Sequence, residues 1–260
     1  MSIESHRIFE CIEATAPRQL AEEWDNVGLS VGSYHQQVST VLTTLDVTEA
    51  VVDEAIANHA ELIVSHHPLI FRGMKRICFE DYKGALIQKL ICNHISVYSA
   101  HTNLDAADEG LNTCVAERLG LEQIKALGGD EIIGKIGVLS DPVSPEIFLE
   151  KVKSIFEIPV LRTSGPMPKR VRRVAICTGS GAAYMDAAKS KRADVFITGD
   201  VKYHDAQRSA ENGIWIIDAG HYGTEKLAGQ LLKKILRECF SEDELKIIVS
   251  SSSQDYFHYH

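Results

Sequence analysis

The sequence predicts an α/β fold with two related α/β lobes. A strand-like run over 38–45, a helical pattern over 49–58 and an apolar run over 62–64 follow one another in the first half. This order is typical of a βαβ unit, in which the two strands are parallel. A similar order recurs in the second half, and in both halves His, Asp and Glu residues follow the apolar runs. Because α/β sheets carry their sites at the carboxyl ends of the strands, we expect the site there, between the lobes.

The internal βαβ repeat is visible when 41–67 is set against 174–200, an offset of 133 positions. Strand then meets strand and helix meets helix without a gap, with the identities Ala50 and Ala183, Asp53 and Asp186, Ala55 and Ala188, and Ala60 and Ala193. An offset of 120 positions lays His101 over His221 and Asp105 over Glu225. Because the identical residues are few, the alternative is that the two segments resemble each other by chance. The shared order of elements and polar positions favours a repeat.

The lobe boundaries follow from the elements between the two βαβ units. The second lobe begins with a strand over 134–139 and a helix over 144–155. We expect the first lobe to span 1–125 and the second 126–260, with a hinge at Leu127-Gly128-Gly129-Asp130. The C-terminal strand is expected to pack back on the first lobe.

Composition and charge exclude several classes of protein. The formal net charge of the 260 residues is -9, and no Lys/Arg cluster is spaced with aromatic residues along one face, so a nucleic-acid partner is not expected. Glu4, Arg7 and Glu10 interrupt the N-terminal apolar stretch, which excludes a secretory signal there, and no run of about 18 apolar residues predicts a membrane span. The six cysteines show no paired spacing, which predicts reduced thiols and a cytoplasmic location.

Two adjacent histidines, His66 and His67, end an apolar run and are followed by Pro68. Burying two imidazoles without a cation or acceptors would be costly. Adjacent side chains on an extended segment point opposite ways unless the backbone turns, and Pro68 restricts the backbone of His67. The pair therefore indicates metal binding. The isolated histidines are interpreted as structural or surface residues: His6, His35, His59 and His94.

A histidine and a carboxylate stand four positions apart in His101-Thr-Asn-Leu-Asp105 and again in His221-Tyr-Gly-Thr-Glu225. Imidazole and carboxylate ligands suit Zn, Fe, Mn, Co or Ni, and the lack of candidate thiolates argues against a structural zinc cage. A carboxylate can bridge, so five ligands can hold two divalent ions about 3.5 to 4 Å apart, with positions open to water. These ligands are His66, His67, Asp105, His221 and Glu225.

Several motifs resemble one family, the Nif-three-like dinuclear-metal hexameric proteins, known as GTP cyclohydrolase 1 type 2 homologs. They are EEWDNVGLSVG, SHHP with Phe71 and Lys75 downstream, SAHTNLDAADEGLN, FITGDVKYHDA and GHYGTEK, and they span the chain from Trp24 to Glu225. The resemblance implies a toroidal homohexamer of two-lobed subunits, each with two metal ions facing an internal cavity. It implies that His66 and His221 bind one ion and His67 and Asp105 the other. Glu225 would bridge them.

The activity that the resemblance implies is metal-dependent hydrolysis, with attack on C8 of the guanine ring of GTP and release of formate. His101 and His204 are the candidate acid/base residues, and Asp46, Asp200 and Asp218 are candidates to orient the ligating imidazoles. One alternative is a metal-binding oligomeric platform or regulatory protein without turnover. Another is hydrolysis of a different substrate, a phosphoester or an amide.

Two further features are interpreted as lying outside the chemistry. Gly179-Ser180-Gly181 follows a strand, but it matches no complete phosphate-binding motif, so an ordinary strand-to-helix turn is favoured over an anion site. His258 and His260 stand at the end of the sequence given, in a tail that departs from the family pattern. We therefore expect that replacing either by alanine leaves the metal content unchanged.

Overall fold

The computed structural model describes residues 2–128 and 133–258. Residues Gly129 and Asp130 of the expected hinge, and His260, lie outside this range. By its contacts the chain divides into two units. The first comprises Met1–Ala107 and Lys226–Gln254, and the second Asp108–Glu225 and Asp255–His260. The expected limits of 1–125 and 126–260 stay a prediction. In this division the residues from 108 to 125 group with the second unit, and those from 226 to 254 group with the first, where the strand Lys246–Val249 pairs with Thr40–Thr44.

The first unit is built on a five-stranded sheet that is parallel except at one edge. In spatial order its strands are β13 (Lys246–Val249), β4 (Thr40–Thr44), β5 (Leu62–Ser65), β6 (Ser96–Ser99) and the antiparallel β2 (Gly28–Val31). Every residue of β4, β5 and β6 is buried, as expected for parallel strands covered on both faces. A separate antiparallel pair joins β1 (Ile3–Glu4) and β3 (Gln37–Val38).

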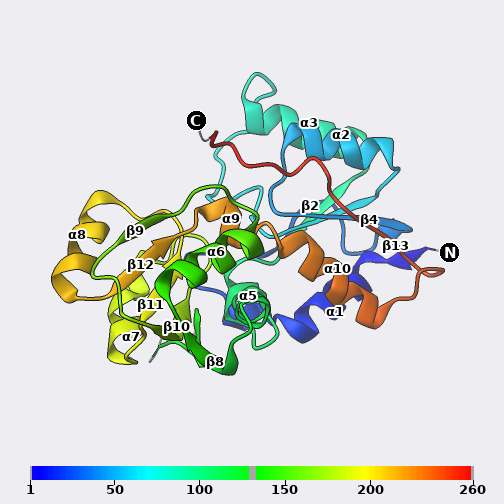
Figure 1. Ribbon diagram of the computed structural model, residues 1–260. Helices are drawn as coiled ribbons and strands as arrows, with labels where there is room; N and C mark the ends of the chain where they lie inside the picture. Colours follow the sequence, from blue (N-terminus) through cyan, green and yellow to red (C-terminus); the bar gives the residue numbers. More distant parts are fainter. Residues whose placement is uncertain (1, 129–132, 259–260) are drawn as a thin grey trace. The chain divides into compact units, whose positions relative to one another are not determined.

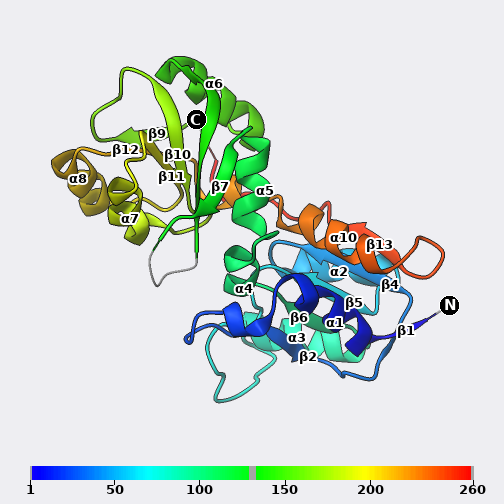
Figure 2. The ribbon, with the colours of Figure 1, turned by 90° about the horizontal axis from the view of Figure 1, so that it is seen from below.

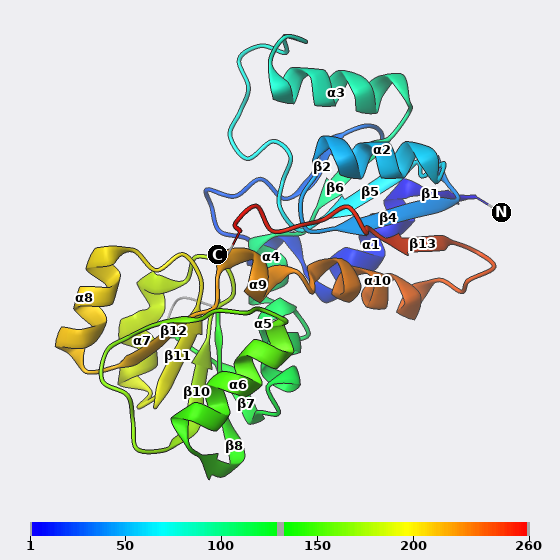
Figure 3. The same cartoon turned by 45° about the horizontal axis from the view of Figure 1, so that its top comes forward.

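Helices cover both faces of this sheet. In Figure 3, α2 (Glu49–Ala57) and α3 (Tyr82–Cys92) lie on one side, and α1 (Ser5–Thr15) and α10 (Ala228–Cys239) on the other. Apolar residues of α2 and α3 pack with those of β4, β5 and β6 in one core cluster. The short η1 (Arg18–Leu20) and α4 (Thr102–Ala106) complete the unit.

A disulfide joins Cys11 of α1 to Cys239 at the end of α10, with Cα atoms 6.3 Å apart. The prediction that all six cysteines are reduced thiols is therefore wrong for this pair. The two residues are separated by 228 positions, so no local spacing could indicate the bond. Packing of α1 against α10 brings the two sulfur atoms together.

The second unit is built on a six-stranded mixed sheet. Figure 1 shows most of its strands, whose full order is β7 (Glu122–Ala126), β8 (Lys135–Val143), β10 (Val171–Ile176), β11 (Val195–Thr198), β12 (Trp215–Asp218) and β9 (Arg162–Ser164). The central β10, β11 and β12 are parallel, and the outer strands are antiparallel to their neighbours. The predicted α/β class is confirmed in both units.

Helices also cover both faces of the second sheet. Figure 2 shows α5 (Leu111–Arg118) and α6 (Pro145–Phe156) on one side, and α7 (Met185–Ser190) and α8 (Tyr203–Asn212) on the other. The start of α6 follows from its sequence, because the Ser144 side chain accepts a hydrogen bond from the Ile147 amide and proline occupies the first helical position. The remaining elements are η2 (Ala182–Tyr184) and α9 (His221–Glu225). No helix within the described residues is long and apolar enough to cross a membrane.

The two sheets share part of their strand register. Val41 pairs with Leu62 in the first unit and Val174 with Val195 in the second, which is the same register at the offset of 133. For the third strand the offset in the sequence was 120, which places Ser99 over position 219. In the structure Ser65 pairs with Ser99 but Thr198 pairs with Asp218, so the register of the third strand differs by one position. The internal repeat stays a prediction, and the registers of the first two strands agree with it.

Glu54 of α2 holds the segment that follows β13. Its carboxylate accepts hydrogen bonds from the hydroxyl groups of Ser250 and Ser251, at 2.5 and 2.8 Å, and from the amides of Ser251 and Ser252, at 2.9 and 3.1 Å. Burial alone would raise the pKa of Glu54, but these hydrogen bonds outweigh it and lower the pKa from 4.5 to about 2.

We therefore expect Glu54→Gln to destabilise the first unit at neutral pH by about 1 kcal/mol, a low value for charged hydrogen bonds because the side chain is partly exposed. A depressed pKa stabilises the folded state above the unfolded value, so the difference between wild type and variant should shrink as pH falls from 4.5 towards about 2. Urea unfolding at several pH values measures this difference. A constant difference across that range would show that the charge of Glu54 does not matter.

Candidate metal centre

Three imidazoles gather in the first unit where strands of the sheet end. His66 and His67 follow β5, and His101 follows β6 and precedes α4. One ring nitrogen from each lies within 4.8 Å of the others, and the three ring centroids are 5.2 to 5.5 Å apart. The pairing of β5 with β6 produces this group, because parallel neighbours end at the same edge of a sheet.

Each of these rings is held through Nδ1. The His66 Nδ1 donates to the carbonyl oxygen of Ala100 at 2.8 Å, the His67 Nδ1 to Asp46 Oδ1 at 2.7 Å and the His101 Nδ1 to Asp25 Oδ1 at 2.9 Å. All three partners are acceptors, so Nδ1 carries the proton and, in the neutral ring, Nε2 carries the lone pair. Metal-ligating histidines are held in this manner, and the donor set therefore fits a metal ion.

A carboxylate accompanies this group. Asp105 lies on the short α4, buried, with its Oδ1 3.7 Å from the Nε2 of His66. Its amide donates to the His101 carbonyl oxygen at 3.1 Å, so the turn of helix fixes the spacing of four residues between His101 and Asp105. The first unit thus brings together three of the predicted residues, His66, His67 and Asp105, with His101.

Asp25 is the partner of His101 that the sequence analysis did not identify. Its carboxylate also accepts from the amide and hydroxyl of Thr102, at 3.0 and 2.5 Å. Burial would raise the pKa of Asp25, but the hydrogen bonds from His101 and Thr102 outweigh it and lower the pKa to about 2. Asp25 is part of the EEWDNVGLSVG motif, and this position was the signal in the sequence that could have identified it as a site residue. Asp25 is a charged partner that keeps the His101 ring in one orientation.

Two aromatic side chains stand beside His101. The ring centroids of Trp24 and Phe71 lie 6.3 and 6.2 Å from that of His101, and 5.7 Å from each other. Trp24 is 59% exposed and Phe71 39% exposed. Large apolar rings exposed beside a polar group offer a surface on which a planar ligand can stack.

In the second unit, His221 and Glu225 lie on α9, which follows β12. The Nε2 of His221 is 3.0 Å from Glu225 Oε2, and its Nδ1 is 2.8 Å from Asp200 Oδ2. Asp200 follows β11 and has a φ of 53°, an uncommon conformation for a residue other than glycine. His221 therefore has an aspartate partner on Nδ1, as His67 has. The role of Asp46 and Asp200 in orienting metal ligands stays a prediction, and these contacts agree with it. Asp218 instead binds Arg162 and the backbone amides of Val201 and Gly220.

The turn at Gly179 packs against Glu225. A Cβ atom on Gly179 would lie 2.0 Å from Glu225 Oε1, so glycine is required for this close approach, and the φ of 63° is also one that glycine tolerates. The Gly179 amide donates to the hydroxyl oxygen of Thr224 at 2.9 Å. The turn that the sequence analysis interpreted as an ordinary connection thus shapes the surroundings of a candidate ligand.

His204 and His258 show no comparable setting. His204 is exposed on α8, with its Nδ1 3.4 Å from Gln207 Oε1 and its ring edge-on to Tyr203. Within the residues that the structure describes, neither His204 nor His258 belongs to a group of three His, Cys, Asp or Glu ligand atoms within 4.8 Å. A catalytic role for His204 stays a prediction.

Comparison with known proteins gives the family. A sequence model of the Duf34/NIF3 (NGG1p interacting factor 3) family matches residues 3–256. The chain belongs to this family. Duf34/NIF3 membership confirms the resemblance that the motifs indicated.

Two relatives of this Duf34/NIF3 chain share the name GTP cyclohydrolase 1 type 2 homolog. The protein of that name from Clostridium acetobutylicum is 37% identical over 231 residues, covering 86% of each chain. That from Clostridium perfringens is 35% identical over 257 residues, covering 97% of this chain and 98% of its own. Among solved structures, a Bacillus cereus protein related to NIF3 superposes with a TM-score of 0.91 at 28% identity, over 98% of this chain and 99% of its own.

Proposed function

We propose that this Duf34/NIF3 chain is a dinuclear metal-dependent hydrolase, which opens the guanine ring of GTP and releases formate. The observation that carries the proposal is the group of three imidazoles, each fixed through Nδ1, with ligand atoms within 4.8 Å. The proposed metal ligands are His66, His67, Asp105, His221 and Glu225, and the proposed ions are two divalent cations, Zn, Fe, Mn, Co or Ni.

The donor set supports this assignment. His66 and Asp105 are buried side by side in the first unit, and His221 and Glu225 are paired at 3.0 Å in the second, so each unit holds an imidazole with a carboxylate. When bound, two cations would supply an activated water at neutral pH. Asp46 and Asp200 would keep the imidazoles of His67 and His221 in the ligating tautomer.

The proposed reaction consumes two water molecules. The first adds at C8 of the guanine ring, the C8–N9 bond breaks and N9 takes a proton, which leaves a formamide on N7. The second hydrolyses the formamide, so that C8 leaves as formate and N7 takes a proton. His101 would move these protons through Nε2, and the hydrogen bond that holds its Nδ1 to the Asp25 carboxylate supports this role. His204 is the other proposed acid/base residue.

The exposed rings of Trp24 and Phe71 support a purine substrate. They stand beside His101, and a base–aromatic stack is worth about 1–3 kcal/mol. We therefore expect Trp24→Ala to raise the KM for GTP by about tenfold with a smaller effect on kcat, while Trp24→Phe stays close to wild type. Steady-state kinetics of formate release measures both. An unchanged KM in Trp24→Ala would mean that the base does not stack there.

The orienting role of Asp46 predicts a loss of metal affinity. Replacing Asp46 by asparagine keeps the shape but removes the charge that faces the His67 Nδ1, and we expect an affinity about 10- to 100-fold lower for the loaded ion. Competition with a chromogenic chelator measures this affinity. Asp243→Asn is the matched control, since Asp243 is exposed near the end of the chain. Equal affinities in the two variants would contradict the orienting role.

The proposed assembly is a toroidal homohexamer, and the proposed compartment is the cytoplasm, where GTP is available. The Cys11–Cys239 disulfide is an exception to the rule that such bonds are rare in that compartment. Sedimentation equilibrium tests the hexamer, and alkylation of thiols in freshly broken cells tests whether the bond is present in the cell.

The function is tested by stripping the protein with a chelator, reloading it anaerobically with one defined metal and assaying formate release from GTP. Formate that is abolished by the chelator and restored by the metal supports the cyclohydrolase. If the loaded protein hydrolyses a phosphoester or an amide but not GTP, it is still a hydrolase, but with a different substrate. Full metal occupancy with no turnover across nucleotides, phosphoesters and amides would favour the binding platform.

A further inference from the structure

We propose that Glu4, His6 and His35 form a second divalent-metal site, made of residues that the candidate metal centre does not use. One ligand atom from each lies within 4.8 Å of the other two. Glu4 presents one oxygen to each ring, with Oε1 3.0 Å from the Nδ1 of His35 and Oε2 3.3 Å from the Nδ1 of His6. The sequence analysis interpreted both histidines as structural or surface residues, because each is isolated in the sequence.

The backbone holds these three residues in place. Glu4 ends β1 and caps α1, and the pairing of β1 with β3 places it opposite Gln37. The amide of His6 donates to the carbonyl oxygen of Tyr34 at 3.0 Å, which ties the first turn of α1 to the turn that carries His35. The ligands are therefore gathered before any metal binds, which lowers the entropic cost of binding.

The state of His6 points to a cation. Its Nδ1 is buried and makes no hydrogen bond within the described residues, although the Glu4 oxygen is 3.3 Å away. A buried nitrogen without a hydrogen bond is costly. A metal ion between the Nδ1 lone pair and the Glu4 carboxylate would satisfy both groups.

The ligand set defines the class of metal. Two imidazoles and one carboxylate suit zinc and similar transition metals, whereas calcium and magnesium prefer oxygen ligands. His35 is 81% exposed at its side chain, so water can reach a fourth position. A bound ion would link the start of the chain to the turn before β3 and stabilise the first unit in proportion to metal concentration.

The site is tested by zinc content and by anomalous scattering. After dialysis against zinc in excess, wild type should hold one zinc per chain more than His35→Ala and one more than Glu4→Gln. His258→Ala serves as the control for loss of an exposed histidine and should match wild type. Crystals soaked in zinc should show an anomalous peak between the three side chains.

Equal zinc content in wild type and both variants, with no anomalous peak at Glu4, would overturn the site. Circular dichroism checks that each variant is folded, and Glu4→Gln keeps the size of the side chain if His35→Ala does not fold. If the proposed dinuclear centre binds no metal, the zinc content of wild type and of every variant falls by the same amount. The expected difference of one zinc per chain between wild type and the two variants would remain.

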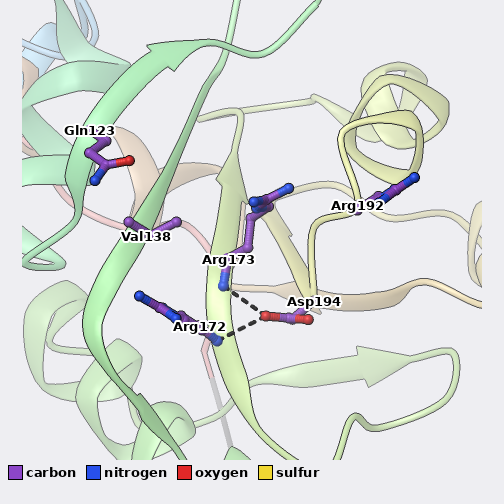
Figure 4. Close-up of a pocket in the computed structure, with 6 residues that line it drawn as sticks. All are labelled: Gln123, Val138, Arg172, Arg173, Arg192 and Asp194. Atoms are coloured by element: carbon purple, nitrogen blue, oxygen red, sulfur yellow. Dashed lines mark hydrogen bonds between the residues drawn. The ribbon is translucent and has the colours of Figure 1, made fainter.

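A second, independent inference concerns a basic pocket of about 500 Å³ in the second unit. Figure 4 shows the residues that line it: Gln123, Val138, Arg172, Arg173, Arg192 and Asp194. An adjoining pocket adds Lys125 and Lys191 to its lining. Such a gathering of cations is unexpected in a chain with a net charge of -9. We infer that this pocket binds a small anion that carries phosphate groups.

Asp194 does not neutralise the pocket. Its Oδ2 accepts hydrogen bonds from the backbone amides of Arg172 and Arg173, at 2.9 and 2.7 Å, and the Arg173 guanidinium donates to the carbonyl oxygen of Lys191 at 3.0 Å. The basic side chains that line the two pockets outnumber this one carboxylate five to one. Arginine forks match phosphate oxygens in geometry and charge. Asp194 precedes β11, whereas His221 follows β12, so the pocket lies at the opposite end of these parallel strands from His221.

The pocket is tested by titrating the protein with inorganic pyrophosphate in a calorimeter. The protein is first freed of metal, so that a metal centre cannot contribute to pyrophosphate binding. We expect Arg192→Gln to weaken binding about tenfold, as the loss of one charged hydrogen bond implies. Lys189→Gln removes the same charge from the neighbouring α7 and should bind as wild type does. Equal weakening in both variants would show a general charge effect and overturn the site, as would the absence of binding to wild type.

Discussion

Replacing Glu225 by alanine is expected to remove more metal than any other single change of a ligand, from two ions per chain to nearly none. The reason is the proposed bridge: if Glu225 is shared by both ions, its loss would deprive each ion of a ligand, whereas His221→Ala should release one ion. The setting supports this role, because Glu225 is buried, 3.0 Å from the Nε2 of His221 and closely packed against the Gly179 turn. Elemental analysis of anaerobically purified protein gives the count.

The control for Glu225→Ala is His258→Ala, which changes a residue outside the proposed site and should keep both ions. Formate release from GTP should fall at least 100-fold in Glu225→Ala, in step with the metal. A variant that keeps two ions per chain would defeat the bridging assignment, even if its activity were lost.

Opening the disulfide between Cys11 and Cys239 is expected to cost the first unit about 2–4 kcal/mol of unfolding free energy, because the bond closes a loop of 228 positions in the unfolded chain. Cys239→Ser should lower the urea midpoint, and wild type in excess dithiothreitol should unfold at the same urea concentration as the variant. Circular dichroism under both conditions measures the difference.

Cys92→Ser is the matched control for this prediction. Cys92 is an exposed free thiol at the end of α3, and its replacement should change stability by no more than about 0.5 kcal/mol. If Cys239→Ser and Cys92→Ser unfold alike and the reductant has no effect, the disulfide does not stabilise the first unit.

The elements predicted best from the sequence are those with a strong local pattern. The helix expected over 49–58 is α2 at Glu49–Ala57, and the strand expected over 62–64 is β5 at Leu62–Ser65. In both segments the spacing of apolar residues and the turn residues beside them determine the structure. A short stretch of sequence therefore contains the necessary information.

The features that were missed depend on residues far apart in the chain. Asp25 meets His101 across 76 positions, and Cys11 meets Cys239 across 228. No local pattern encodes such pairs, because packing of whole elements brings them together. The candidate ligands His66 and His67 could be predicted because two adjacent histidines after a buried strand are unusual in themselves.

The first unit is discontinuous, and this has a consequence for biosynthesis. On the ribosome, β4 emerges about 200 residues before its partner β13 at the sheet edge, a delay of about 10–40 s at typical elongation rates. The whole sheet of the second unit, by contrast, lies within the single stretch from 108 to 225. We therefore expect the domain translated first to mature last, and to need protection of its uncovered apolar face by a chaperone until α10 arrives.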